Sequence, residues 1–139
     1  MSQFLDRLTF FEGIPAILEQ LRQKGFTLHI LSSNSEENIR EFLTAQGITS
    51  VETVTSARNV FGKNRAISKF LRQHGLSPAD ILYVGDEERD IVACKDVKVR
   101  IAAVTWGLDS EDILRAAGAD VIVNRPQDLL GIVESVTVR

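Results

Sequence analysis

The stretch that most constrains the fold of this chain runs from Asp80 to Asp90 and reads Asp-Ile-Leu-Tyr-Val-Gly-Asp-Glu-Glu-Arg-Asp. Its apolar residues Ile81 to Val84 stand between a Ser-Pro turn and a glycine, which is typical of a strand buried on both faces in a parallel sheet. Gly85 allows a sharp turn, so Asp86 is expected at the carboxyl end of the strand. Open α/β sheets bind their ligands at that end.

Asp86 and Asp90 have two interpretations. If a helix begins near Glu87, both aspartates lie on one side of its first turn, where two hard oxygen ligands suit Mg²⁺. The alternative is that Asp86 caps the helix, whose positive end is complemented by Glu87, Glu88 and Asp90. Spacing alone does not choose between a metal site and a cap.

Strand and helix patterns alternate along the whole chain. Helices are expected from Ile14 to Gly25, about Glu36 to Gln46, from Lys63 with Ile67, Phe70 and Leu71 on one face, about Glu87 to Asp96, Ser110 to Ala117, and about Pro126 to Glu134. Further strands are expected at Thr27 to Leu31, Val51 to Ser56, Val99 to Thr105 and Val121 to Val123, after an ordered arm over residues 1–13. The alternation predicts an α/β fold of three layers, with a mostly parallel sheet and helices on both faces.

Length and composition narrow the class of protein. The 139 residues are expected to form a single domain, and a net charge of -3 with 25% charged residues gives no electrostatic case for nucleic acid. No apolar run approaches the roughly 20 residues that span a bilayer, so no membrane contact is predicted and the cytoplasm is the default location. The one cysteine, Cys94, is expected to be a small buried residue.

Polar groups at three strand-to-helix junctions could together bind a phosphate. Ser32 could donate its hydroxyl and the amides of Ser33 and Asn34 could point the same way, with a helix dipole behind them. Lys63 would neutralise charge, and Asp86 would hold a Mg²⁺ that also binds the phosphoryl group. All of these residues are expected near the face that carries the strand ends.

Each of these residues also has a purely structural interpretation. Ser32 and Ser33 could cap the helix that follows them, and for an isolated Ser-Ser-Asn-Ser this is the more frequent role. Lys63 could be a solvated lysine, and Arg89 could pair with the acids around it. The functional interpretation depends on their joint position at one predicted face.

Four segments resemble the second, third and fourth motifs of haloacid-dehalogenase-like phosphatases. They are Leu28 to Asn34, Gly62-Lys63, Tyr83 to Ile91, and Ala103 to Gly107. The resemblance covers about residues 10–131 and is nearest to the phosphoglycolate-phosphatase-like branch. It implies a Rossmann-like core and a Mg²⁺-dependent phosphate monoester hydrolase.

The resemblance also assigns roles. Ser32 matches the phosphate-binding Ser/Thr, with Ser33 and Asn34 beside it. Lys63 matches the catalytic lysine that stabilises the phosphoryl group, Asp86 the Mg²⁺ ligand, and Asp90 the acidic residue that supports the metal site.

One motif of the family is missing. Relatives begin with a strand ending in Asp-x-Asp, whose first Asp attacks phosphorus, and these 139 residues contain no Asp-x-Asp. Asp6 has no second carboxylate two residues on and is not accepted as the nucleophile. The nucleophile strand, expected between the strands that end at Ser32 and Asp86, and the substrate-selecting cap are therefore both predicted to be missing. Loss of that strand would leave backbone groups to be paired in another way.

The sequence thus predicts a phosphatase core for a small phosphorylated molecule, inactive alone. The alternative is a non-catalytic module that binds a phosphorylated ligand or another protein. A third possibility is a fragment of a longer enzyme. Self-association or a partner strand at the gap in the sheet is a further expectation for either of the first two.

Overall fold

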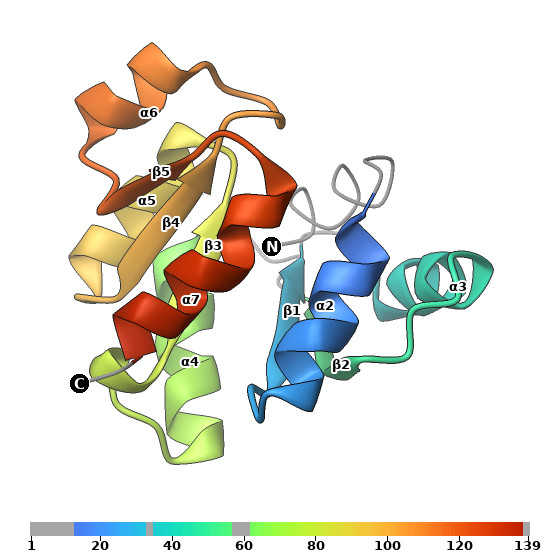
Figure 1. Cartoon of the computed structure of the whole chain (residues 1–139). Helices are drawn as coiled ribbons and strands as arrows, with labels where there is room; N and C mark the ends of the chain where they lie inside the picture. Colours follow the sequence, from blue (N-terminus) through green and yellow to red (C-terminus); the bar gives the residue numbers. More distant parts are fainter. Residues whose placement is uncertain (1–12, 33–34, 57–61, 138–139) are drawn as a thin grey trace. The chain divides into compact units, whose positions relative to one another are not determined.

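The computed structural model describes residues 13–32, 35–56 and 62–137 (Figure 1). Residues 1–12 of the arm expected over residues 1–13, which include Asp6, lie outside these described residues, as do Ser33 and Asn34. The chain divides into two compact units, one comprising Met1–Arg58 with Arg125–Arg139 and the other comprising Asn59–Asn124. The expectation of a single domain over residues 1–139 stays a prediction.

The first unit is built on the two parallel strands β1 (Leu28–Ser32) and β2 (Val51–Ser56). Its helices are α2 (Ile14–Gln23), α3 (Glu36–Ala45) and α7 (Leu129–Thr137), with a 3-10 turn η2 (Pro126–Asp128) before the last. The apolar side chains of α2 recur at helical spacing and are buried: Ile14, Ile17, Leu18 and Leu21. This face explains why α2 packs against α7 and η2.

The second unit is a three-stranded parallel sheet in the order β3 (Leu82–Gly85), β4 (Arg100–Val104), β5 (Val121–Val123). Its helices are α4 (Lys63–His74), α5 (Glu88–Asp96) and α6 (Glu111–Ala117), and a 3-10 turn η1 (Pro78–Asp80) precedes β3. The central strand β4 is almost fully buried from Ile101 to Val104. In register, Gly85 of β3 lies beside Ala103 of β4, which brings the ends of these two strands together.

The α/β class and the parallel strands predicted from the sequence are confirmed. Most boundaries agree within one or two residues, and the predicted α4 face of Ile67, Phe70 and Leu71 is buried. The last helix differs, because Pro126–Asp128 forms a 3-10 turn and the α-helix continues to Thr137. Among the described strands, β1 has the one neighbour β2, and β3 has the one neighbour β4, so each lies at the edge of its own sheet.

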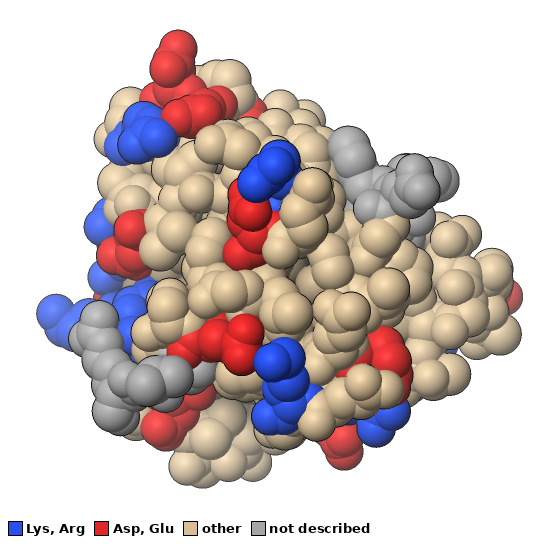
Figure 2. All heavy atoms as spheres, viewed as in Figure 1, with Lys and Arg blue, Asp and Glu red and all other residues tan. Residues whose placement is uncertain are grey.

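Basic and acidic side chains are interspersed on the face shown in Figure 2. The helices of the chain also carry ion pairs at i and i+4, such as Arg40 with Glu36 at 2.8 Å and Arg115 with Glu111 at 2.7 Å. Within the described ranges, none of the helices has the length and apolarity needed to cross a membrane.

Candidate active site

Asp86 lies immediately after β3 and is completely buried. Its carboxylate Oδ2 accepts a hydrogen bond from the backbone N–H of Leu108 at 2.9 Å, and its carbonyl oxygen accepts one from the N–H of Asp109 at 3.0 Å. A Cβ at Gly107 would overlap the Asp86 side chain. The loop after β4 therefore holds Asp86 by both its side chain and its main chain.

Asp90, in the first turn of α5, connects the end of β3 to a lysine. Its Oδ2 accepts hydrogen bonds from the N–H groups of Asp86 at 3.3 Å and Glu87 at 3.2 Å, and its Oδ1 accepts one from the Lys63 ammonium. A Cβ at Gly85 would come within 2.6 Å of Asp90 Oδ2, so glycine is needed where the strand passes this carboxylate. Both Asp90 oxygens are thus engaged by protein donors.

The charges at this site are buried and closely packed. Asp86, Glu87 and Asp90 are each at most 4% exposed. Lys63 pairs with Asp90 and is only 13% exposed, whereas Arg89 pairs with Glu87 and remains 60% exposed. Three carboxyl groups against two cationic side chains leave a surplus of acid, which favours a bound cation.

Two purely structural interpretations are wrong for the residues concerned. The cap of α5 is Glu87, which forms a reciprocal capping box with Asp90, and not Asp86. The cap of α3 is Ser35, whose hydroxyl accepts from the N–H of Asn38 at 3.1 Å, and not Ser32. Helix capping therefore does not explain why Asp86 and Ser32 stand at their positions.

The interpretation of Lys63 as a solvated lysine is also wrong, since it forms a largely buried ion pair. The expected pairing of Arg89 with a neighbouring acid is confirmed by its bond to Glu87. Cys94 is buried in α5, as predicted.

The structure brings three of the predicted site residues together in the second unit: Lys63, Asp86 and Asp90. Ser32 ends β1 in the first unit and is 1% exposed. Its participation with Ser33 and Asn34 in the same phosphate site stays a prediction.

Sequence reasoning missed the contribution of Asp109. Its Oδ2 accepts a hydrogen bond from the N–H of Glu88 at 2.8 Å, across 21 positions of the chain. The nearest sequence feature is Gly107, the last residue of the fourth motif segment. This glycine indicates a close approach to Asp86, and it does not predict the hydrogen bond made by Asp109.

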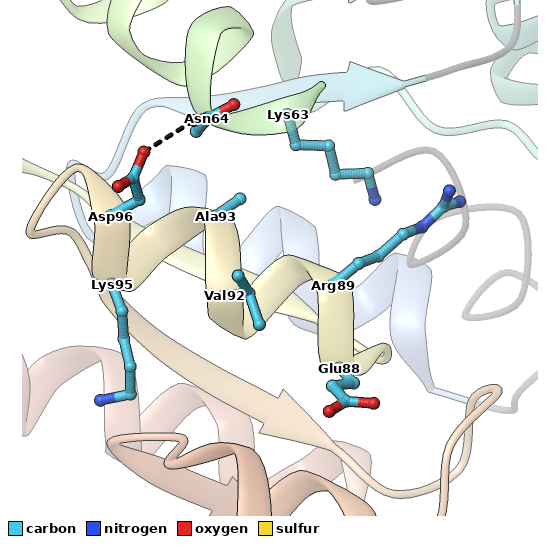
Figure 3. A pocket seen from close by; sticks show the side chains of 8 residues that line it. All are labelled: Lys63, Asn64, Glu88, Arg89, Val92, Ala93, Lys95 and Asp96. Atoms are coloured by element: carbon cyan, nitrogen blue, oxygen red, sulfur yellow. Dashed lines mark hydrogen bonds between the residues drawn. The ribbon is translucent and has the colours of Figure 1, made fainter. Parts of the chain in front are cut away.

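A shallow groove runs along α4 and α5 beside this site. It is lined by Lys63, Asn64, Glu88, Arg89, Val92, Ala93, Lys95 and Asp96. Figure 3 shows Lys63 and Arg89 extending toward one end of the groove, while Asn64 bonds Asp96 at 2.7 Å at the other. Two of the three cationic side chains that line the groove, Lys63 and Arg89, therefore lie at the same end, where Lys63 binds Asp90.

Buried titratable groups beneath the site show the same acidic environment. Burial raises the pKa of the Cys94 thiol to about 12, and the Asp90 carboxylate adds to the effect. Burial, followed by the charge of Asp90, also raises the pKa of the Tyr83 phenol well above its ordinary value. Both groups are therefore neutral in the folded protein near pH 7.

The residues present could supply part of the coordination of a magnesium ion. Mg²⁺ is usually held by one or two carboxylates together with water and substrate phosphate oxygens, and Asp86 supplies a hard carboxylate at the end of a strand. The described residues contain no group of three His, Cys, Asp or Glu side chains placed to hold a metal. Both oxygens of Asp90 accept hydrogen bonds from protein donors, so Asp90 supports Asp86 and Lys63, and its predicted contribution to the metal site stays a prediction.

Comparison with known proteins identifies the class of this chain. Residues 1–104 match the family model described as haloacid dehalogenase-like hydrolase. The chain therefore belongs to the haloacid dehalogenase-like hydrolases.

Individual relatives indicate which members of this family the chain resembles. A phosphoglycolate phosphatase from Synechococcus elongatus is 42% identical over 131 residues, which cover 94% of this chain and 62% of that protein. A phosphoglycolate phosphatase from Aquifex aeolicus is 29% identical, over 90% of this chain and 59% of that protein. The chain thus spans about three fifths of the length of these relatives.

A solved structure supports the fold. A haloacid dehalogenase-like family hydrolase from Streptococcus pneumoniae superposes with a TM-score of 0.79 at 22% identity, over 88% of this chain and 59% of that one. The resemblance inferred from the sequence motifs, to phosphoglycolate-phosphatase-like members of this family, is confirmed.

Proposed function

We propose that this chain supplies the magnesium- and phosphate-binding half of a phosphate monoester hydrolase site. The observation that carries the proposal is the position of Asp90, which accepts hydrogen bonds from Lys63 and from the backbone of Asp86. One buried carboxylate thereby sets a cation and a hard oxygen ligand side by side. This pairing serves a phosphoryl group, whose transfer depends mainly on positioning and charge stabilisation.

Each residue has a defined task in this proposal. Asp86 holds Mg²⁺, which when bound neutralises negative charge on the phosphoryl oxygens. Lys63 also neutralises phosphoryl charge, and Asp90 keeps its ammonium group in place. The motif resemblance assigns Ser32, with Ser33 and Asn34, to binding the same phosphate. The substrate is a small phosphorylated molecule, and the names of the relatives suggest phosphoglycolate as the first to test.

We further propose that these 139 residues do not hydrolyse the substrate alone. The family reaction requires an aspartate nucleophile in Asp-x-Asp, and the sequence has none. The same observation favours a second candidate function, which is a non-catalytic module that binds a phosphorylated ligand. The two candidates differ in whether a nucleophile-bearing segment restores turnover.

Hydrolysis and binding measurements test both candidates. Hydrolysis of p-nitrophenyl phosphate and phosphoglycolate would be followed with and without Mg²⁺ for the wild type, Asp86→Ala and Asp6→Ala. Mg²⁺-dependent binding of inorganic phosphate would be measured in parallel by calorimetry. Asp80→Ala is the matched control, because the Asp80 carboxylate also accepts a backbone N–H, that of Ser77 at 2.7 Å, but before β3 rather than after it.

We expect no turnover, together with Mg²⁺-dependent phosphate binding that Asp86→Ala abolishes and Asp80→Ala retains. Turnover lost in both Asp86→Ala and Asp6→Ala would identify Asp6 as the nucleophile and contradict the proposed inactivity. Restored hydrolysis on adding a peptide that carries Asp-x-Asp would favour the hydrolase over the binding module. Phosphate binding that ignores both Mg²⁺ and Asp86→Ala would refute the proposed site.

A further inference from the structure

The loop between β4 and α6 makes three hydrogen bonds to the segment that follows β3. The N–H of Leu108 binds the Asp86 carboxylate, the N–H of Asp109 binds the Asp86 carbonyl, and the Asp109 carboxylate accepts from the N–H of Glu88. Asp109 takes part in two of these bonds, as donor to the Asp86 carbonyl and as acceptor from the Glu88 N–H, so it links both ends of the segment from Asp86 to Glu88.

The direction of the Asp86 carboxylate depends on this loop. Its Oδ2 is oriented by the Leu108 N–H at 2.9 Å, and the adjacent residue, Asp109, anchors that part of the loop. On the other side of Leu108, a Cβ at Gly107 would overlap the Asp86 side chain. The loop therefore confines Asp86 through a donor and through close packing, and Asp109 holds both in place.

We infer that Asp109 is a positioning residue for the magnesium ligand Asp86. The inference rests on the proposed function, in which Asp86 binds Mg²⁺. Asp109 acts indirectly, because its carboxylate binds the Glu88 N–H and its main-chain N–H binds the Asp86 carbonyl, and neither of these bonds is made to the Asp86 carboxylate. Without the carboxylate, the loop loses its attachment to the first residue of α5 and keeps the main-chain bond from Asp109 to the Asp86 carbonyl, so the Leu108 N–H is held less firmly opposite Asp86 Oδ2. Partners that orient a metal ligand in this way typically contribute about 10- to 100-fold to metal affinity.

The simpler explanation is that Asp109 only stabilises the N-terminus of α5, as an acidic residue near a helix start does. A stabilising role would lower resistance to urea but would leave the Mg²⁺ dissociation constant of the folded protein unchanged. A positioning role changes the affinity for Mg²⁺ and the environment of the Leu108 amide even where the protein is fully folded.

The test uses the full chain and Mg²⁺ alone as the probe. Calorimetric titration would give the Mg²⁺ dissociation constant for the wild type, Asp86→Ala, Asp109→Ala, Asp109→Asn and the control Asp80→Ala. Amide hydrogen exchange at Leu108 and Glu88, measured by NMR without metal, supplies a readout independent of binding. We expect Asp109→Ala to weaken Mg²⁺ binding by about tenfold or more and to speed exchange at both amides.

The other variants sharpen the result. Asp109→Asn retains an oxygen acceptor for Glu88 and is expected to bind Mg²⁺ more tightly than Asp109→Ala, whereas Asp80→Ala is expected to match the wild type. If Asp109→Ala does not fold, Gly107→Ala tests the same loop with Asp109 intact and is expected to weaken binding by displacing Asp86.

Failure of this inference can be told apart from failure of the proposed function. If the wild type binds Mg²⁺ through Asp86 but folded Asp109→Ala, or Asp109→Asn where Asp109→Ala does not fold, leaves the dissociation constant unchanged, the positioning role is overturned and the proposed function stands. If the wild type does not bind Mg²⁺, or Asp86→Ala binds it equally well, the proposed function falls and the inference falls with it.

Discussion

The ion pair between Lys63 and Asp90 allows a quantitative test of how the site is held together. Asp90 is 2% exposed and Lys63 13% exposed, so removing one partner leaves a poorly hydrated charge on the other. Breaking such a buried pair typically costs about 3–5 kcal/mol. The two backbone N–H donors to Asp90, at 3.2 and 3.3 Å, are long and add at most about 1 kcal/mol. We therefore expect Asp90→Ala to lower the free energy of unfolding by about 4 kcal/mol.

A double-mutant cycle isolates the pair from these other contacts. Lys63→Met is expected to cost less than Asp90→Ala, because two N–H groups still solvate the remaining carboxylate. The variant with both changes is expected to be little worse than Asp90→Ala, so the coupling energy equals the cost of Lys63→Met alone, about 2 kcal/mol. Urea unfolding at pH 7 supplies the free energies, and fluorescence of Trp106, the single tryptophan, reports on the second unit.

The control is the exposed pair of Arg115 and Glu111 in the same unit, whose side chains are 61% and 39% exposed. Its coupling is expected to be no more than a few tenths of a kcal/mol, about the usual value for a helical surface pair. A Lys63–Asp90 coupling as small as this control would refute the conclusion that Asp90 positions Lys63 through a buried contact.

Three further predictions concern the surroundings of the site. Because the pKa of Cys94 is about 12, the native protein should not react with a thiol reagent at pH 8, and the thiol should react once urea unfolds the chain, as a colorimetric assay would show. The pKa values of Cys94 and Tyr83 are both raised on folding, so the unfolded state loses these protons at a lower pH than the folded state. The free energy of unfolding should therefore be fully retained below about pH 9 and then fall by up to about 1.4 kcal/mol per pH unit for each group. Urea midpoints measured between pH 8 and 11 would show this fall. Gly107→Ala should destabilise the protein by about 1–3 kcal/mol through overlap with Asp86, whereas Gly131→Ala, where a Cβ meets no atom within 4 Å, should be neutral or stabilising by circular dichroism melts.

Local patterns account for the parts of the structure that were predicted correctly. Helix α4 was recognised because Ile67, Phe70 and Leu71 fall on one face at helical spacing, and β2 because Val51–Ser56 is rich in β-branched residues. The cap of α5 was harder to predict. Gly85 belongs to β3, which moves the turn one residue along and makes Glu87, rather than Asp86, the capping residue.

The sequence by itself determined the α/β alternation, the strand-glycine-aspartate unit that ends at Asp86, and the lack of an Asp-x-Asp nucleophile. These features depend on neighbouring residues, whose periodicity and turn chemistry can be read along the chain. Only the tertiary structure decided how the carboxylates are used. Asp90 binds Lys63, 27 positions away in the sequence, and Asp109 binds Glu88, 21 positions away. The packing of α4, α5 and the loop after β4 brings these residues together. Burial then excludes water from Lys63 and Asp90, and this exclusion makes the ion pair between them a fixed part of the site.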